Sequence, residues 1–151
     1  MPAKYPAKAS WATIGGVKKY YRSKMELNFA YYLEWLKSRG LIKDWQHESE
    51  TFWFLSIKRG VRSYLPDFKV TNNDDSIVYK EVKGYMDSRS LVKIKRFNKF
   101  YPQFTLEVIR TKHMNAIDRQ VGAMIPGWES AIVIKKCIRK AKARAKRVTK
   151  R

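Results

Sequence analysis

The chain is poor in the residues that build disulfide frameworks, zinc fingers and membrane spans. Its 151 residues include a single cysteine, Cys137, and two histidines. One cysteine forms no internal disulfide, and so few soft ligands exclude a zinc finger or a histidine-rich metal site. No apolar run approaches the roughly 18 residues of a membrane span, and residues 1–11 hold no apolar stretch of signal-peptide length. We therefore set aside secreted scaffolds and membrane proteins, and expect a cytoplasmic protein that contacts no membrane.

Acidic residues are also scarce. The sequence holds 33 Lys and Arg against 13 Asp and Glu, for a formal net charge of +20. Hydrophobic residues still make up 44% of the chain and aromatic residues 14%, so a disordered basic polymer is excluded. The length favours one domain with a real core. The first expectation is a partner that carries many negative charges.

The positive charge is concentrated at the two ends. Residues 1–24 hold six basic residues and residues 135–151 hold ten, and neither segment contains an acid. The remaining 17 basic residues and all 13 acids give residues 25–134 a net charge of +4. We predict a basic extended arm over residues 1–20, a nearly balanced domain over 21–134 and a basic C-terminal helix or tail over 135–151. Such arms typically bind phosphate backbones, and a solubilising tail is the alternative.

The hydrophobic periodicity alternates between helical and strand patterns along the chain. Residues 23–38 place apolar side chains at helical spacing, with Ser23 as a suitable N-cap and Gly40 as a stop. The further predicted elements are strands over 50–57, 61–70 and 76–83, a helix over 88–101, a strand over 104–109 and a basic helix from Ser130 onward. Residues 113–128 show no clear pattern. This order predicts an α/β fold in which helices flank a small mixed β-sheet.

Two acids and a lysine fall on neighbouring predicted strands. Residues two apart on a strand share a face, so Glu81 and Lys83 point the same way. Asp67 lies on the preceding strand, and the polar turn at 72–75 predicts a hairpin that brings Asp67 close to Glu81. Their carboxylates suit Mg²⁺ or Mn²⁺, and the backbone carbonyl of Val82 offers a further oxygen ligand. Lys83 would then orient a water or stabilise charge on an attacked phosphate.

Glu26 is the third candidate metal-binding carboxylate, because it lies in the first turn of the first predicted helix. Ser23 and Glu26 also form the pattern of a capping box, which accounts for Glu26 without catalysis. A Pro-Asp pair is common at turns, and Glu-x-Lys on a strand is commonly a weak, solvated ion pair. The combination of motifs, more than any one of them, indicates a site.

This order of motifs resembles the PD-(D/E)xK nuclease superfamily over residues 21–109. The first helix is similar to the acidic helix of phage endonuclease I junction resolvases and of phage head-completion nucleases, in the stretch YRSKMELNFAYYLEWLKSRG followed by WQHESETF. The second half is similar to small phage proteins of this class, in YLPDFKV and VYKEVKGYMDSRSLVKIKRFNKFYP. The resemblance implies a metal-dependent DNA endonuclease with an α/β/α core, which would act in the cytoplasm of a host cell.

Carried over residue by residue, the resemblance matches Asp67, Glu81 and Glu26 to the metal-binding acids and Lys83 to the catalytic lysine. The resolvases form intertwined dimers, but no bridging segment is evident here, so a homodimer stays an open alternative. One further acid of the resolvases has no assigned counterpart among Asp44, Glu48 and Glu50.

Basic and aromatic residues outside the acids are candidates for DNA contact. The basic candidates are Lys93, Lys95, Arg96 and Lys99 on the second helix and Lys135, Lys136, Arg139 and Lys140 in the tail. The alternative for each is a solvated helix face. The aromatic candidates either stack on unpaired bases or fill the core, and they are Tyr20, Tyr21, Tyr31 and Trp35.

Two classes of function follow. The first is a Mg²⁺- or Mn²⁺-dependent endodeoxyribonuclease that nicks or cuts branched DNA, with a head-completion or packaging nuclease as a variant. The second is a non-catalytic basic protein that binds nucleic acid or docks on an acidic protein surface. The acids favour the enzyme, because carboxylates beside a phosphate repel it unless a cation relieves the repulsion.

Overall fold

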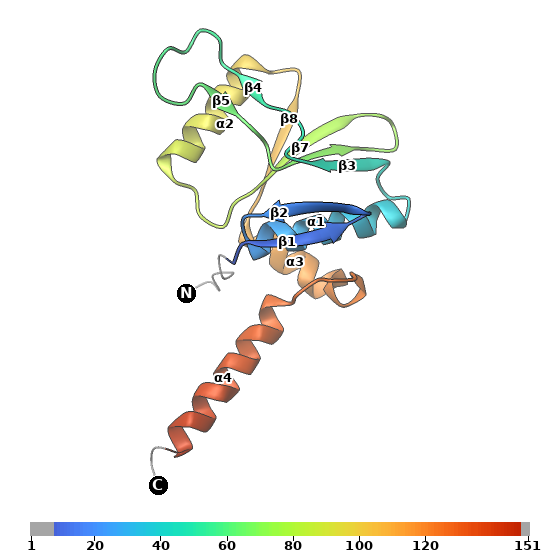
Figure 1. Ribbon diagram of the computed structural model, residues 1–151, viewed down its shortest axis with the longest axis vertical. Coiled ribbons are helices and arrows are strands. Elements are labelled where there is room, and N and C mark those ends of the chain that lie inside the picture. The colour runs from blue at the N-terminus through green and yellow to red at the C-terminus, as the bar shows by residue number, and fades with distance from the viewer. Residues whose placement is uncertain (1–7, 149–151) are drawn as a thin grey trace.

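The computed structural model describes residues 8–148, without the side chains of residues 132–135, 137, 147 and 148. A four-stranded mixed sheet lies at the centre of the body (Figure 1). In spatial order its strands are β3 (Asp44–His47), β6 (Phe68–Thr71), β7 (Ile77–Val82) and β8 (Thr105–Ile109). The first three are antiparallel neighbours, whereas β7 and β8 are parallel and are connected through α2 (Ser88–Phe100). The predicted α/β class with a small mixed sheet and flanking helices is confirmed.

Helix α1 (Lys24–Ser38) covers one face of this sheet. Ser23 is its N-cap and accepts a hydrogen bond at Oγ from the backbone N–H of Glu26, at 3.0 Å. Phe29 packs edge-on against Phe68 of β6, with ring centroids 5.3 Å apart, and both rings are almost fully buried. Burial of a side chain of this size contributes roughly 2–3 kcal/mol. The predicted apolar stripe of α1 therefore forms the main core.

Alternate residues of β7 point to opposite sides of the sheet. Helix α2 covers the side opposite to α1. A second core gathers here around Phe52, whose ring meets those of Tyr79 and Phe97 edge-on at 5.0 and 4.9 Å. Phe52 belongs to β4 (Phe52–Trp53), which pairs with β5 (Ser63–Tyr64) as a separate two-stranded unit. The two cores place the sheet between helices.

The prediction of an extended arm over residues 1–20 is wrong for residues 10–20. These residues form a hairpin of β1 (Ser10–Ile14) and β2 (Val17–Tyr21), and residues 1–7 lie outside the described part of the chain. Gly15 and Gly16 form its turn with φ values of 58° and 79°, the left-handed pair that a two-residue hairpin loop requires. Ile14 and Tyr21 bury the inner face of the hairpin against α1. The glycine pair therefore specifies a tight turn.

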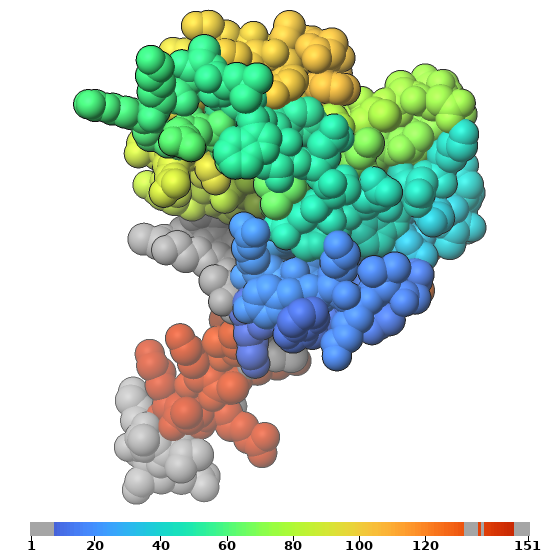
Figure 2. Space-filling model, turned by 45° about the horizontal axis from the view of Figure 1, so that its top comes forward, coloured from blue at the N-terminus to red at the C-terminus, as the bar shows by residue number. Residues whose placement is uncertain are grey.

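The C-terminal part packs on the α1 side and then leaves the body. Helix α3 (Thr111–Val121) contributes Met114 to the main core, and the short helix η1 (Gly122–Met124) follows it. The buried amide of Asn28 bonds both the backbone O and the backbone N–H of Glu129, at 2.9 and 3.0 Å. Helix α4 (Ala131–Val148) then projects away from the sheet, as Figures 1 and 2 show. A helix is thus present up to Val148 where the basic C-terminal helix or tail was predicted, and residues 149–151 lie outside the described part of the chain.

Most predicted elements appear with small shifts in their ends. The helix over 88–101 and the strands over 76–83 and 104–109 are confirmed as α2, β7 and β8. The strand predicted over 50–57 is reduced to β4, and the strand predicted over 61–70 is divided at Pro66 into β5 and β6. Pro66 has no N–H to donate to a ladder, which explains the break. No helix within residues 8–148 has both the length and the apolar character needed to cross a membrane.

Candidate active site

Strand pairing brings Asp67 and Glu81 together at one end of the sheet. The antiparallel register of β6 and β7 pairs Phe68 with Lys80, so one further step places Asp67 opposite Glu81. The backbone N–H of Val82 donates to Asp67 Oδ2 at 2.8 Å and fixes this carboxylate across the strand end. The predicted β6–β7 hairpin is therefore present, and it sets two of the predicted acids side by side.

Glu48 lies next to Asp67, directly after β3, the strand on the other side of β6. The backbone N–H of Glu48 donates to the Asp67 carbonyl at 2.8 Å, directly after the β3–β6 ladder ends at the His47–Phe68 pair. Glu48 has a φ of 45°, a left-handed conformation that turns the chain away from the strand. Its carboxylate forms an ion pair with Arg22, at 2.6 Å from Oε1 to Nη2. Glu48, Asp67 and Glu81 thus lie at the same end of three adjacent strands.

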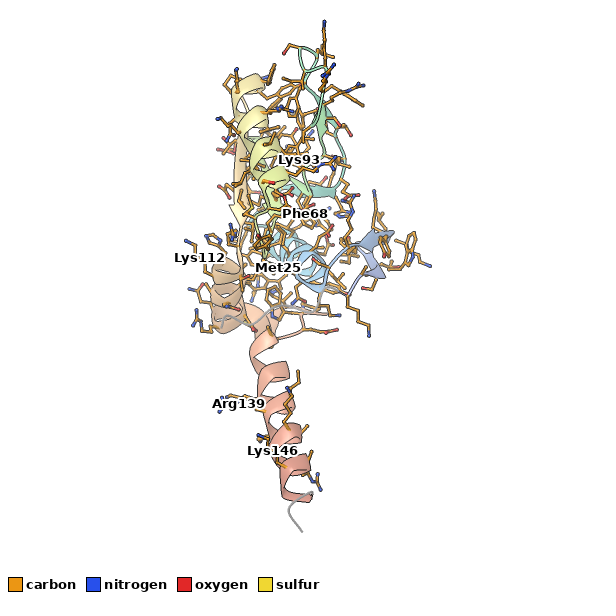
Figure 3. All side chains as sticks on the ribbon, turned by 90° about the vertical axis from the view of Figure 1, so that its left-hand side faces the viewer. Met25, Phe68, Lys93, Lys112, Arg139 and Lys146 are labelled. Atoms are coloured by element: carbon orange, nitrogen blue, oxygen red, sulfur yellow. The ribbon has the colours of Figure 1, made fainter. Side chains whose placement is uncertain are left out.

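Glu81 is a buried carboxylate, 6% exposed, with defined partners. Its Oε2 accepts the hydroxyl of Tyr64 at 2.7 Å, and its Oε1 lies 3.6 Å from Lys83 Nζ. Burial raises the pKa of Glu81, and Tyr64, Lys83, the Asp67 backbone and Lys93 oppose that rise. Lys93 belongs to α2 and lies above Phe68 and Met25 in Figure 3. Lys83, directly after β7, and Lys93 of α2 therefore both act on the charge of this one carboxylate.

Asp67 is the second acid of the site whose pKa is raised. Burial raises its pKa well above the usual range, and the charges of Glu81 and Glu26 raise it further. The Val82 N–H and Lys83 act in the opposite direction. All four predicted catalytic residues, Glu26, Asp67, Glu81 and Lys83, are thus close enough to interact electrostatically. Concentrated negative charge that is incompletely compensated favours the binding of a cation.

Glu26 combines a structural role with a place in this group. Its Oε2 accepts the backbone N–H of Arg22 at 3.0 Å, so it helps to cap α1 in the manner of a capping box. Its Oε1 lies 2.6 Å from His47 Nε2, and both side chains are buried. One carboxylate oxygen of Glu26 therefore serves the start of the helix, and the other faces His47.

His47 is held between two aromatic rings. Its centroid lies 4.5 Å from that of Tyr21 and 5.3 Å from that of Phe68. Among the described residues, its Nδ1 is the one buried side-chain nitrogen or oxygen without a hydrogen-bond partner. Burial, followed by the charge of Glu26, raises the pKa of Tyr21 to about 12, so this neighbour stays neutral. His47 can thus hold Glu26 in place from within the core.

The acids form two adjacent groups on opposite faces of the sheet. Glu26, His47 and Glu48 have ligand atoms within 4.8 Å of one another, and no other such trio occurs in the part of the chain that the structure describes. Their face belongs to α1, because His47 pairs with the α1-facing Phe68. Glu81 shares the α2 face with Tyr79, two residues earlier. Asp67 lies where the two groups meet at the sheet end.

The predicted DNA-binding residues differ in their surroundings. Lys95 and Lys99 are exposed on α2, whereas Arg96 donates to the carbonyl of Val61 and so holds the segment before β5. On α4, Lys136, Arg139 and Lys140 are exposed, and Figure 3 shows Arg139 and Lys146 along this projecting helix. The side chain of Lys135 lies outside the described residues. Arg96 thus holds a neighbouring segment, whereas Lys95, Lys99, Lys136, Arg139 and Lys140 are exposed to solvent.

Tyr64 and His47 are the functional neighbours that the sequence alone did not reveal. Tyr64 precedes Asp67 within a predicted strand, but its approach to Glu81 depends on the separate β4–β5 unit. Trp45 and His47 alternate at strand spacing, which was the one local signal for β3. Neither pattern indicates a carboxylate partner distant in sequence.

A cavity of about 380 Å³ lies beside the site, between the β1–β2 hairpin, α1 and β3. His47 and Tyr21 line it, together with Glu34 and Trp45, which are joined by a hydrogen bond of 2.8 Å from Nε1 to Oε2. Asp67 and Glu81 do not line it. The acids at the strand ends therefore stand outside this cavity.

No protein-family model and no curated protein matches the chain. The function is therefore inferred from the residues themselves.

Proposed function

We propose that the protein is a divalent-metal-dependent endonuclease that hydrolyses phosphodiester bonds in branched or otherwise structured DNA in the cytoplasm. The observation that carries the proposal is the group at the sheet end, where the half-buried Asp67 and the buried Glu81 interact with Glu26 and Lys83. A protein of net charge +20 that buries carboxylates beside its lysines has little reason to do so for binding alone.

The donor atoms fit Mg²⁺ or Mn²⁺. Both ions prefer carboxylate oxygens and bind with one or two acids plus substrate phosphate. Burial and the acidic neighbours raise the pKa of Asp67, so its ionised form is unfavourable. A bound cation would stabilise that ionised form. Asp67 and Glu81 would hold the ion, with Glu26 and the Val82 carbonyl as further oxygen donors. Such an ion supplies charge neutralisation at the phosphate and lowers the pKa of water.

The other residues perform the positioning. Val82 fixes the Asp67 carboxylate through its N–H, and Tyr64 fixes that of Glu81 through its hydroxyl. His47 directs Glu26 in the same way. Lys83, 3.6 Å from Glu81 Oε1, is placed to hold a water or to stabilise negative charge on the attacked phosphate.

Binding of the polymer falls to the basic surfaces. Lys93 lies within the field of Glu81, and the exposed Lys136, Arg139 and Lys140 extend along α4 away from the acids. Contacts of this kind are made to phosphates and do not read sequence, so we expect recognition of DNA shape. The acids would then supply the chemistry and the basic elements the affinity.

The test is a cleavage panel of labelled linear, nicked, flapped and four-way DNA, with Mg²⁺, Mn²⁺ or a chelator. We expect metal-dependent cutting that falls by about a hundredfold or more in Asp67→Ala, Glu81→Ala and Lys83→Ala, while DNA binding persists. Glu107→Ala is the matched control, because Glu107 is a carboxylate of the neighbouring strand β8 whose partner is Lys80. It should cut like the unmodified protein.

Two results would contradict the proposal. If Asp67→Ala cuts DNA at the rate of the unmodified protein, the assignment of the site is wrong. Binding of every substrate with no cutting in any metal would indicate the non-catalytic DNA-binding protein.

A further inference from the structure

The β1–β2 hairpin presents a solvent-facing surface that the proposed chemistry does not use. Side chains alternate along its strands, so Ile14 and Tyr21 point to α1 while the opposite face points to solvent. We name this opposite face the ribbon outer face, and it consists of Trp11, Thr13, Lys18 and Tyr20. These residues pair directly across the two strands, Trp11 with Tyr20 and Thr13 with Lys18.

Two large aromatic rings are exposed on this face. Trp11 is 64% exposed and Tyr20 is 46% exposed, although both belong to a well-paired ladder. Their centroids lie 5.5 Å apart with an interplanar angle of 57°, and Lys18 Nζ lies 5.7 Å from the Trp11 ring centroid. An exposed aromatic pair with a cation beside it is typical of a surface that stacks on planar ligands.

The aromatic pair lies at the end of the hairpin nearest to the acids. Tyr20 precedes Tyr21, whose ring packs on His47, and the next residue, Arg22, pairs with Glu48. Arg22 also donates its backbone N–H to Glu26. The glycine turn is at the other end of the hairpin. A ligand that crosses the ribbon outer face at Trp11 and Tyr20 would therefore continue toward the sheet end.

Charge decides what kind of ligand fits. Residues 8–25 carry Lys8, Lys18, Lys19, Arg22 and Lys24 and no acid. A second copy of this chain would bring the same positive surface and a net charge of +20. A nucleic acid strand brings phosphates for the lysines and flat bases for the rings.

We propose that the ribbon outer face binds unpaired DNA bases by stacking on Trp11 and Tyr20, next to the strand that is cut. The proposal deepens the proposed endonuclease function and rests on it for its biological meaning. Bases within a duplex already stack on their neighbours, whereas unpaired bases offer a free face to an aromatic ring. The face thus selects DNA with a single-stranded segment, such as a flap or an opened branch.

The experiment measures binding without cutting. A fluorescently labelled thymidine oligonucleotide of about 12 nucleotides and a duplex of the same length are titrated with the full chain in a chelator, and anisotropy gives each Kd. We expect Trp11→Ala and Tyr20→Ala each to weaken oligonucleotide binding about tenfold, and to change duplex binding by less than about twofold. Trp11→Phe retains a ring and should recover most of the affinity.

Trp53→Ala is the matched control. Trp53 lies on β4, is 54% exposed, and has its backbone carbonyl bound by Tyr101. Its removal should leave both Kd values unchanged. Because Trp11 and Tyr20 are exposed, thermal unfolding of the variants should match that of the unmodified chain, and this confirms that the ribbon is intact.

Each outcome supports or overturns the proposal. Equal loss of oligonucleotide and duplex binding, or no loss of either, overturns it. Conversion of a dimer to a monomer by Trp11→Ala at unchanged oligonucleotide affinity would assign the face to self-association and also overturns it. If Asp67→Ala cuts normally while Trp11→Ala loses oligonucleotide binding, the endonuclease proposal fails and the stacking surface stands. If cutting depends on Asp67 but Trp11→Ala binds the oligonucleotide normally, the endonuclease proposal stands and the stacking proposal fails.

Discussion

The hydroxyl of Tyr64 offers the sharpest test of the site, because its removal changes one hydrogen bond and almost nothing else. Tyr64 is 2% exposed, donates to Glu81 Oε2 at 2.7 Å and packs its ring on Phe97, with centroids 5.6 Å apart. Tyr64→Phe keeps that ring contact and opens no large cavity. The variant therefore isolates the donor that stabilises a buried carboxylate.

The expected destabilisation follows from the partner's charge. A hydrogen bond to an ionised group contributes about 1.5–3 kcal/mol, more than one between neutral groups. We expect Tyr64→Phe to lower the free energy of unfolding by about 2 kcal/mol near neutral pH. With a urea m-value of about 2 kcal/mol/M, the midpoint should fall by about 1 M. Tyr85→Phe is the control, because Tyr85 is 80% exposed, and its midpoint should not move.

The effect should shrink on acidification. Burial raises the folded-state pKa of Glu81 above its ordinary value of 4.5, and the Tyr64 bond lowers it, so the variant has the higher folded-state pKa. As the pH falls through that higher pKa, the variant takes up its proton first and regains part of its stability. The difference should approach about 1 kcal/mol once Glu81 is protonated in both proteins. A difference below about 0.5 kcal/mol near neutral pH, or one that does not change with pH, would refute the reasoning.

Two further predictions concern charge and backbone geometry. In a chelator, Asp67→Asn should raise the free energy of unfolding at neutral pH by about 1–2 kcal/mol, because the amide oxygen still accepts the Val82 N–H while the buried charge is gone. The unmodified chain should gain stability as the pH falls through the raised folded-state pKa of Asp67, and Asp67→Asn should gain less. Urea melts at several pH values measure both effects. A variant less stable than the unmodified chain would contradict the assignment. Gly127→Ala should destabilise by about 2–4 kcal/mol, since Gly127 has a φ of 83° and its Cβ would lie 2.7 Å from the Tyr31 ring. Gly16→Ala has a similar φ of 79° but open space around its Cβ, so thermal melts should show a loss of only about 1 kcal/mol, and equal losses at both glycines would refute the close contact.

The strongly periodic segments could be predicted from the sequence, because the spacing of their apolar residues indicates which side chains are buried. Helix α1 follows from its apolar stripe and from Ser23, and β7 follows from the alternation that ends at Glu81. The strand predicted over 61–70 is interrupted at Pro66, between β5 and β6. In these regions local propensity and tertiary packing agree.

Prediction failed where a short element depends on a distant partner. Residues 10–20 were predicted to belong to an extended arm, because prolines, small residues and a glycine pair are typical of irregular segments. Only contact with α1, through Ile14 and Tyr21, shows which face is inner. Strand β3 has four residues and is stabilised by pairing with β6, so its own pattern is too short to detect.

The sequence by itself determined the charge layout, the α/β class and the candidates Glu26, Asp67, Glu81 and Lys83, because these depend on residue type and local period. The tertiary structure alone decided that the sheet divides the acids between an α1 face and an α2 face. It also joined Tyr64 to Glu81 and His47 to Glu26, and turned Trp11 and Tyr20 outward. These are contacts between segments far apart in the chain, and such contacts are set by strand register and by which side of the sheet a residue faces. Neither is encoded in the residues on one side of the contact.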